Sequence, residues 1–166
     1  MNKFTRGIIT AAALTFSFGA FSLSANACGY NVGKLEIEHP WSRETPPNAT
    51  VAGAFLKVKN QGDVEDTLVS AESPIAEKVE LHAHVHENGM MKMRQVEGIA
   101  IPANGSEVLK PGSYHVMLFG MKEAPRDGET FPMTLNFEKS GSVDIQVSVK
   151  KVVKSDTKKD KMHHHH

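Results

Sequence analysis

The sequence predicts an all-β protein with a single domain, folded as a sandwich or a barrel. Its 166 residues are enough for one domain. Short runs of alternating apolar and polar residues follow one another along the chain, with turn residues between them. No window of helical length keeps an apolar period of about 3.6 residues. Many short strands separated by closely spaced turns are typical of sandwiches and barrels.

The first half of the domain contains four expected strands and then a hairpin. We place these strands at 34–38, 54–59, 66–70 and 78–82. Apolar and polar residues alternate in them, as they do in strands with one buried face. The dipeptide Asn88-Gly89 favours a tight turn, because both residues tolerate positive φ. We therefore expect a hairpin whose second strand covers 90–94.

The second half of the domain adds five expected strands. We place them at 99–102, 106–109, 114–119, 130–137 and 142–152. Turn residues Pro111-Gly112 and Gly120 bound the segment 114–119. The turn at 139–141 contains a glycine and joins the last two strands, so these strands should form a hairpin.

Both ends of the chain differ from this domain. Residues 1–27 combine two positive charges, an apolar run and an Ala25-Asn26-Ala27 cleavage pattern, which predicts a secretory signal peptide and a secreted protein. Cleavage there would leave Cys28 first. Lipidation of Cys28 is the less favoured alternative, because Asn26 is an unusual neighbour for a lipidated site. Residues 28–152 form the domain, and we expect the Lys- and His-rich residues 153–166 to be disordered.

Charge and cysteine content exclude several classes of protein. Removing Lys3 and Arg6 from the 19 basic residues leaves 17, against 19 acidic residues. This balance predicts no nucleic-acid partner and no polybasic membrane patch. Cys28 is the only cysteine, so no internal disulfide can form and the apolar core must hold the fold.

Histidine and methionine concentrate between positions 82 and 117. Three histidines alternate at His82, His84 and His86 and would share one face of a strand. Met90, Met91 and Met93 follow the Asn-Gly turn, and His115 and Met117 share a face of a later strand. Thioether sulfur is a soft, neutral ligand that suits copper(I), whereas calcium and magnesium need oxygen ligands. These residues therefore indicate a copper(I) site built without cysteine.

Ordinary packing is the competing interpretation of the same residues. Methionines at strand spacing often fill gaps in a core, and single histidines on strands are often solvated or hydrogen-bonded. Taken alone, residue types between positions 82 and 117 leave both interpretations open.

The spacing of four of these residues resembles the periplasmic copper chaperones called PCu(A)C, whose signature is H-x10-M-x21-H-x-M. Ten residues separate His82 from Met93, 21 separate Met93 from His115, and Met117 closes the motif. The resemblance extends over 34–150. It implies a cupredoxin-like Greek-key β-barrel or sandwich, and it implies that His82, Met93, His115 and Met117 hold copper(I). It also implies a non-enzymatic protein that delivers copper toward the binuclear centre of cytochrome c oxidase, often beside a thiol-disulfide partner.

Additional donors lie outside this signature. His84 and His86 are auxiliary candidates for a second shell or a copper(II) landing site, and Met90 and Met91 are candidates for packing or for the mouth of the site. The tail offers four further imidazoles as a flexible copper(II) scavenger, at His163, His164, His165 and His166.

Four alternative functions remain to be separated. Copper storage needs the same ligands as delivery. An electron-transfer cupredoxin needs a cysteine thiolate near its C-terminal histidine, which this chain lacks. A zinc site on His82, His84 and His86 and a metal-free interaction module are the other two. The sequence contains no recognisable nucleophile–base pair or phosphate-binding loop, so we do not expect an enzyme.

Overall fold

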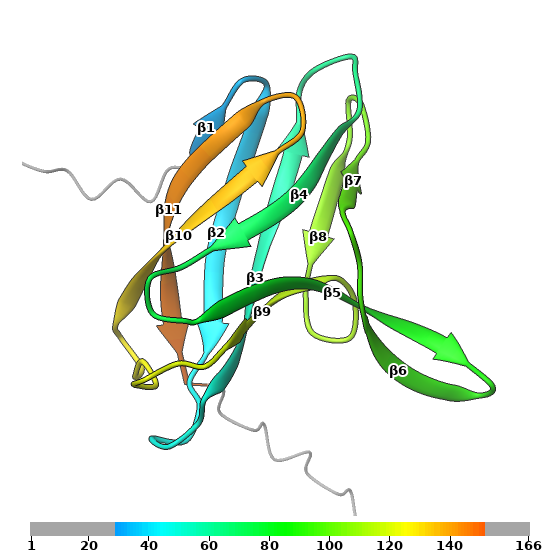
Figure 1. Cartoon of the computed structure of the whole chain (residues 1–166). Helices are drawn as coiled ribbons and strands as arrows, with labels where there is room; N and C mark the ends of the chain where they lie inside the picture. The colour runs from blue at the N-terminus through cyan, green and yellow to red at the C-terminus, as the bar shows by residue number, and fades with distance from the viewer. Residues whose placement is uncertain (1–28, 152–166) are drawn as a thin grey trace, which may run out of the picture.

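The computed structural model describes residues 29–151 (Figure 1). The expected signal peptide, Cys28 and the histidines at 163–166 lie outside the described residues, so the expectations for them stay predictions.

Eleven β-strands make up the described part of the chain. They are β1 (Tyr30–Val32), β2 (Leu35–Arg43), β3 (Val51–Asn60), β4 (Asp66–Glu72), β5 (Lys78–Glu87), β6 (Met90–Gln95), β7 (Ile99–Ile101), β8 (Ser106–Leu109), β9 (His115–Phe119), β10 (Thr130–Phe137) and β11 (Gly141–Lys150). Within residues 29–151, no helix is long and apolar enough to cross a membrane. The all-β, single-domain prediction is confirmed.

The expected strands are all present, but β2, β3 and β5 extend beyond their predicted bounds, and β2 does so past a proline. The dipeptide His39-Pro40 suggests the end of a strand, because proline donates no hydrogen bond to a ladder. In the structure, β2 continues to Arg43 through a register shift between Glu38 and Trp41, where His39 adopts a φ of 49°. The bulge accommodates the proline and lets β2 reach the region of the later site. The short strand β1 was not predicted.

The strands form one sheet that curls on itself. Their order is β6-β5-β9-β3-β2-β11-β10-β4-β7, with β1 beside β2 and β8 beside β3. The pair β2 and β11 is parallel, and the other pairs are antiparallel. Curling brings β4 against β5 and β7 against β8 (Figure 1). The result is a flattened barrel in which strands far apart in sequence are neighbours.

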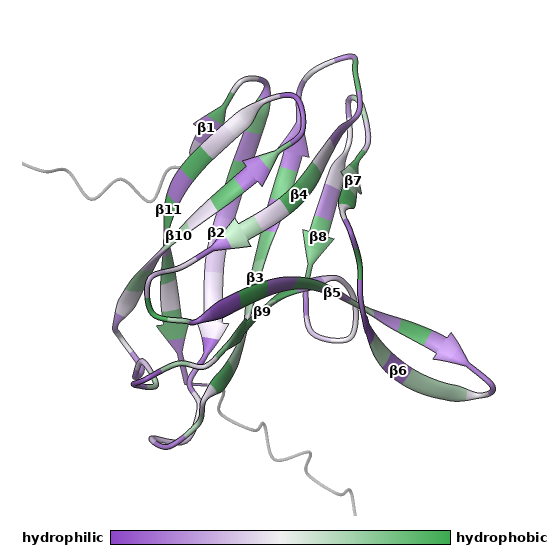
Figure 2. Cartoon of the chain, in the orientation of Figure 1, coloured by the Kyte–Doolittle hydropathy of each residue, from purple (hydrophilic) through white to green (hydrophobic). Residues whose placement is uncertain are grey.

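The hydrophobic core fills the inside of this barrel. On β3, Ala52, Ala54, Leu56 and Val58 are buried in the core, so Gly53 and Phe55 lie on the outer face. On β9, Val116 and Leu118 belong to the core in the same way. Figure 2 shows the resulting alternation of hydrophobic and hydrophilic residues along the strands. His115 and Met117 therefore lie on the outer face of the sheet, opposite the core.

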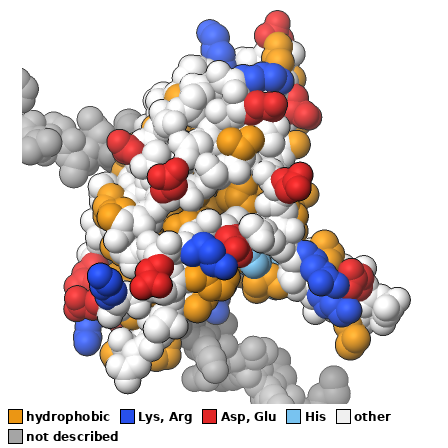
Figure 3. Space-filling model, in the orientation of Figure 1, with side chains coloured by type: hydrophobic (Ala, Val, Ile, Leu, Met, Phe, Trp, Pro, Cys, Tyr) orange, Lys and Arg blue, Asp and Glu red, His pale blue; other side chains and the backbone are white. Residues whose placement is uncertain are grey.

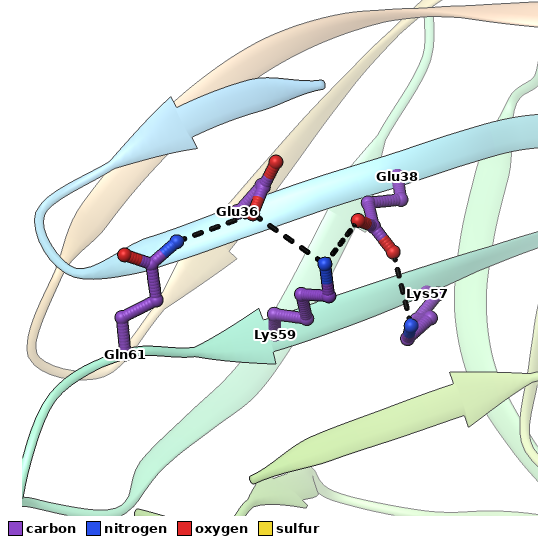
Figure 4. A network of polar contacts seen from close by, with 5 residues as sticks. All are labelled: Glu36, Glu38, Lys57, Lys59 and Gln61. Atoms are coloured by element: carbon purple, nitrogen blue, oxygen red, sulfur yellow. Dashed lines mark hydrogen bonds and ion pairs between the residues drawn. The ribbon is translucent and has the colours of Figure 1, made fainter. Parts of the chain in front are cut away.

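Ion pairs cover part of this outer face on β2 and β3. Lys59 Nζ lies 2.6 Å from Glu38 Oε1, and Lys57 Nζ lies 3.1 Å from Glu38 Oε2 (Figure 4). Glu36 and Gln61 extend the network. Hydrogen bonds from Lys59 and then Lys57 hold the pKa of Glu38 below its usual value. This end of the outer face is thus a solvated polar surface.

The hairpin of β5 and β6 projects from the body as an arm, which we define as residues 83–95. β5 pairs with β9 over Lys78–His82 and with β6 over His82–Glu87. His82 is therefore the last residue of β5 with a strand on both sides. Beyond it the two strands extend away from the barrel (Figure 1).

Candidate metal centre

Strand register brings the predicted ligands of β5 and β9 to one place. His82 lies directly opposite His115, and their ring centroids are 5.9 Å apart. Met117 lies between Glu80 on β5 and Gly53 on β3. Because residues opposite each other in a ladder share a face, these side chains all lie on the outer face of the sheet.

An aromatic pair and a loop shelter His115 on this outer face. The rings of Trp41 and Phe55 lie 4.8 Å apart, and the Phe55 ring lies 6.3 Å from that of His115. His115 is only 3% exposed. A hollow of about 400 Å³ opens beside it. Its lining comprises Arg43, Thr45, Val51, Ala52, Gly53, Phe55, His84, Met93, Pro111, Gly112, His115 and Met117.

His115 offers one free ring nitrogen. Its Nδ1 lies 2.9 Å from the carbonyl oxygen of Ser113, which can only accept, so Nδ1 carries the proton and donates. The Nε2 atom is buried and has no hydrogen-bond partner. Burial lowers the pKa of His115, the nearby His84 and His82 lower it further, and the Ser113 hydrogen bond opposes the shift. The ring is thus neutral at pH 7 with its Nε2 lone pair available.

His82 also offers a free ring nitrogen, but its hydrogen-bond acceptor is a carboxylate and not a backbone carbonyl. Its Nε2 lies 2.8 Å from Glu80 Oε2, and the ring therefore donates from Nε2. Hydrogen bonds from His82 and then Lys78 hold the pKa of Glu80 below its usual value, so this acceptor is ionised. The Nδ1 atom of His82 is buried and unpaired. Buried polar atoms without partners are rare in folded proteins, and two of the three in residues 29–151 belong to these predicted ligands.

The two methionines differ in how firmly they are held. Met117 Sδ lies close to Gly53 of β3, since a Cβ atom placed on that glycine would be in ordinary van der Waals contact with the sulfur at 3.8 Å. Met93 comes from the arm, lies opposite His84, and is 45% exposed. One thioether is therefore packed against the body, and the other is carried on a projecting hairpin.

The predicted site residues fall into three groups in the structure. Met93, His115 and Met117 line the hollow together with the auxiliary candidate His84, whose ring lies 5.1 Å from that of His115. His82 stands beside His115 but does not line the hollow. Figure 3 shows a histidine side chain at the surface where the arm meets the body.

The other candidates lie farther out on the arm. His86 and Met91 are opposite each other, and Met90 lies on the opposite face from them. Sequence reasoning did not identify Glu80, Ser113 or Gly53 as part of the site. The short pattern Glu80-Leu81-His82 was a usable signal for Glu80, because residues two apart on a strand share a face.

Within residues 29–151, no group of three or more histidine, cysteine, aspartate or glutamate side chains is arranged to hold a metal ion. Around His115 the structure places the imidazoles of His82 and His84, and the thioethers of Met93 and Met117 line the hollow beside it.

Comparisons with known proteins agree with this fold. The family model described as "Putative lipoprotein LpqE-like" matches residues 35–149. A protein of Leifsonia xyli subsp. xyli, described as "Putative lipoprotein Lxx21020", is 31% identical over 76% of this chain and 76% of its own length.

Two solved structures have the same architecture. The "Copper-bound PCuAC domain from PmoF2" has a TM-score of 0.65 and 31% identity, and covers 75% of this chain and 98% of its own. The solution structure of Cu(I)-DR1885 from Deinococcus radiodurans has a TM-score of 0.59 and 29% identity over 80% of this chain and 87% of its own. The resemblance drawn from the motif spacing is thereby confirmed, and the chain belongs to the LpqE-like family, that of the PCuAC domains.

Proposed function

We propose that this chain is a periplasmic copper(I) chaperone that binds one ion through His82, Met93, His115 and Met117. The observation that carries the proposal is the pair of buried, unpartnered nitrogens, His82 Nδ1 and His115 Nε2, beside two thioethers. Copper(I) suits imidazole and thioether ligands. None of the four donors brings a negative charge, so the bound copper(I) ion keeps its single positive charge in a site that is only partly shielded from solvent.

The gradient of exposure supports transfer by ligand exchange. His115 is 3% exposed and Met93 is 45% exposed. An incoming acceptor can displace the exposed thioether first, while the buried imidazole still holds the ion. Such a handover makes and breaks only coordination bonds, so the proposal includes no enzymatic step.

Related proteins support the metal and the envelope location. Two PCuAC-type structures with more than 25% identity are described as holding copper, and the family description contains the word lipoprotein. We place the chain in the periplasm, with lipidation at Cys28 as the less favoured alternative. The proposed acceptor is the copper-bearing subunit of cytochrome c oxidase or another copper protein, and a thiol-disulfide protein is the proposed second partner.

A copper(I) titration tests the site. Anaerobic competition with a colorimetric copper(I) chelator should give one tight equivalent, which Met93→Ala and Met117→Ala each weaken by more than about tenfold, a loss of over about 1.4 kcal/mol. Met90→Ala removes another exposed thioether, from the other face of the arm, and should leave this equivalent unchanged. Preference for zinc, or no metal binding, would refute the proposal.

Delivery and storage require a separate experiment, because both use these ligands. Deleting the gene should lower cytochrome c oxidase activity when copper is scarce, and added copper should restore it. Normal oxidase activity together with copper sensitivity would favour storage instead.

A further inference from the structure

The two faces of the arm have different chemistry. One face carries only imidazole, thioether and amide groups, from His84, His86, Met91, Met93 and Gln95. The opposite face carries the charges: Glu87 Oε2 lies 2.9 Å from Lys92 Nζ and 2.7 Å from an Arg94 guanidinium nitrogen. Figure 3 shows positive and negative side chains together on the arm. The cations of the arm thus point away from the face that bears the soft donors.

Strand register brings these soft donors together in pairs. His84 lies opposite Met93, and His86 lies opposite Met91. The N–H of Val96 donates to the carbonyl of Leu81 at 2.9 Å, which marks that position as hydrogen-bonded. Because bonded and non-bonded positions alternate along an antiparallel ladder, both His–Met pairs fall at non-bonded positions, where side chains approach most closely.

The pairs form successive rungs that lead to the proposed site. Rungs two residues apart along a strand are separated by about 7 Å. The inner rung, His84 and Met93, borders the hollow beside His115. The outer rung, His86 and Met91, lies next to the turn, and Met91 is 50% exposed.

We propose that His86 and Met91, with His84 of the inner rung as the third donor, form a second copper(I) site at the outer end of the arm. It rests on the proposed function, because it would supply or receive the ion of the inner site. The Met91 thioether is a soft donor and the two imidazoles suit copper, so this set favours copper(I) over ions such as calcium that need oxygen ligands. With fewer and more exposed ligands, the outer site should bind more weakly than the inner one. Movement between the sites exchanges one donor at a time and changes no oxidation state.

Methionine methyl NMR on the full-length protein tests this assignment. The protein is labelled with 13C at the methionine methyl groups and titrated anaerobically with copper(I). The first equivalent should shift the signals of Met93 and Met117. Further copper(I) should shift Met91, while Met90, on the opposite face of the same turn, should stay in place. A shift of the Met91 methyl signal also distinguishes copper(I) at this site from copper bound by the histidines at 163–166, which contain no methionine.

Variants provide the second readout. His86→Ala with Met91→Ala should abolish binding at the outer site and leave the first equivalent unchanged, whereas Met90→Ala should preserve both steps. These side chains are exposed, so the substitutions leave the core intact.

The results separate this proposal from the preceding one. If Met93 and Met117 shift but Met91 does not move through three equivalents, the outer site is refuted and the chaperone proposal stands. Equal shifts at Met90 and Met91 would also refute it. If no methionine of the domain shifts, both proposals fail.

Discussion

His82 and His115 each present one free ring nitrogen, but different acceptors determine which one. The Ser113 carbonyl takes the Nδ1 proton of His115, and the Glu80 carboxylate takes the Nε2 proton of His82. Each acceptor fixes both the tautomer and the orientation of its ring, as partners of metal-bound histidines commonly do. The free nitrogens, His115 Nε2 and His82 Nδ1, are thus set before any ion arrives.

Glu80 should therefore influence copper affinity without binding the ion. Replacing Glu80 with alanine releases the His82 ring, and losing such a partner typically weakens metal binding by about 10- to 100-fold. Glu80→Gln keeps an acceptor for Nε2 and should cause a smaller loss. Competition titration with a copper(I) chelator measures both. Glu87→Ala, which removes an ion-paired carboxylate from the other face of the arm, is the control. Equal affinity in Glu80→Ala and wild type would contradict the assigned role.

The buried ring of His115 should make the copper-free protein less stable in mild acid. Burial lowers its pKa below 6.5, so between that lowered value and 6.5 the unfolded chain binds a proton that the folded chain excludes. The contribution of His115 is full above about pH 6.5 and falls as the pH drops, by at most about 1.4 kcal/mol per pH unit.

Urea unfolding between pH 8 and pH 5 measures this effect as the difference between wild type and His115→Gln. The difference should shrink below pH 6.5. A difference that is constant over the whole range would contradict the lowered pKa.

The sequence predicts the metal ligands better than it predicts the hydrogen-bond partners of those ligands. The motif spacing from His82 to Met117 predicted four donors, through the resemblance to the PCu(A)C family. It did not identify Ser113 as the acceptor for His115, since any backbone carbonyl can serve and only the turn before β9 selects this one. The sequence offered His84 as an auxiliary donor, but its place on the hollow depends on how β5 leaves the body of the molecule.

At the scale of elements, the turn of the arm controls where Met93 is held. Asn88 and Gly89 have φ values of 53° and 76°, as a type I′ turn requires, so the hairpin predicted from this dipeptide is confirmed. A two-residue turn fixes the register of β6 on β5, and this register sets Met93 opposite His84.

Gly89→Ala should therefore weaken copper binding through the backbone alone. A Cβ atom there would contact nothing within 4 Å, so the cost is that of positive φ, about 1 kcal/mol or more. Loosening the arm by that amount should lower copper(I) affinity by up to about tenfold and speed hydrogen exchange in β6.

Gly128→Ala is the matched control, since Gly128 also has positive φ and open space around its Cβ position but lies outside the arm. It should reduce stability and leave copper affinity unchanged. Loss of affinity in both variants would show that the arm has no special part.

The predicted and observed strands differ where contacts between residues distant in sequence determine where a strand ends. Local alternation predicts β7 to β10 well, because each alternates within its own few residues. The extension of β2 past Pro40 could not be predicted, since the bulge at His39 is stable only when β3 pairs on both sides of it. That extension brings Trp41 to Phe55 and helps shelter His115.

At the scale of the whole molecule, Asp66, the first residue of β4, is hydrogen-bonded to the turn of the last hairpin. Its carboxylate accepts hydrogen bonds from the backbone N–H groups of Thr67, Lys139 and Ser140 at 2.8 to 2.9 Å. Burial alone raises the pKa of Asp66, but these bonds and one from the Ser140 side chain together hold it below 3.8. The ionised carboxylate thus fastens β4 to the turn between β10 and β11.

Asp66→Asn should destabilise the fold by about 2 kcal/mol, because it replaces charge-assisted hydrogen bonds within a buried cluster. The stabilisation in wild type is present above pH 3.8 and is lost as the pH falls through the lowered pKa. Urea unfolding at pH 7 measures the change, and the exposed Asp63→Asn is the control. Copper affinity of the folded Asp66→Asn protein should equal that of wild type, and a large loss would contradict the separation of this cluster from the metal centre.

Because the donors stand on the outside of the sheet, the barrel can fold without reference to what they hold. Exchanging a thioether for another donor on this surface leaves the interior undisturbed, so the preference for a cargo can drift while the scaffold stays constant. Proteins with this barrel can therefore change their metal specificity during evolution, and new ligands can be engineered on this surface without disrupting the fold.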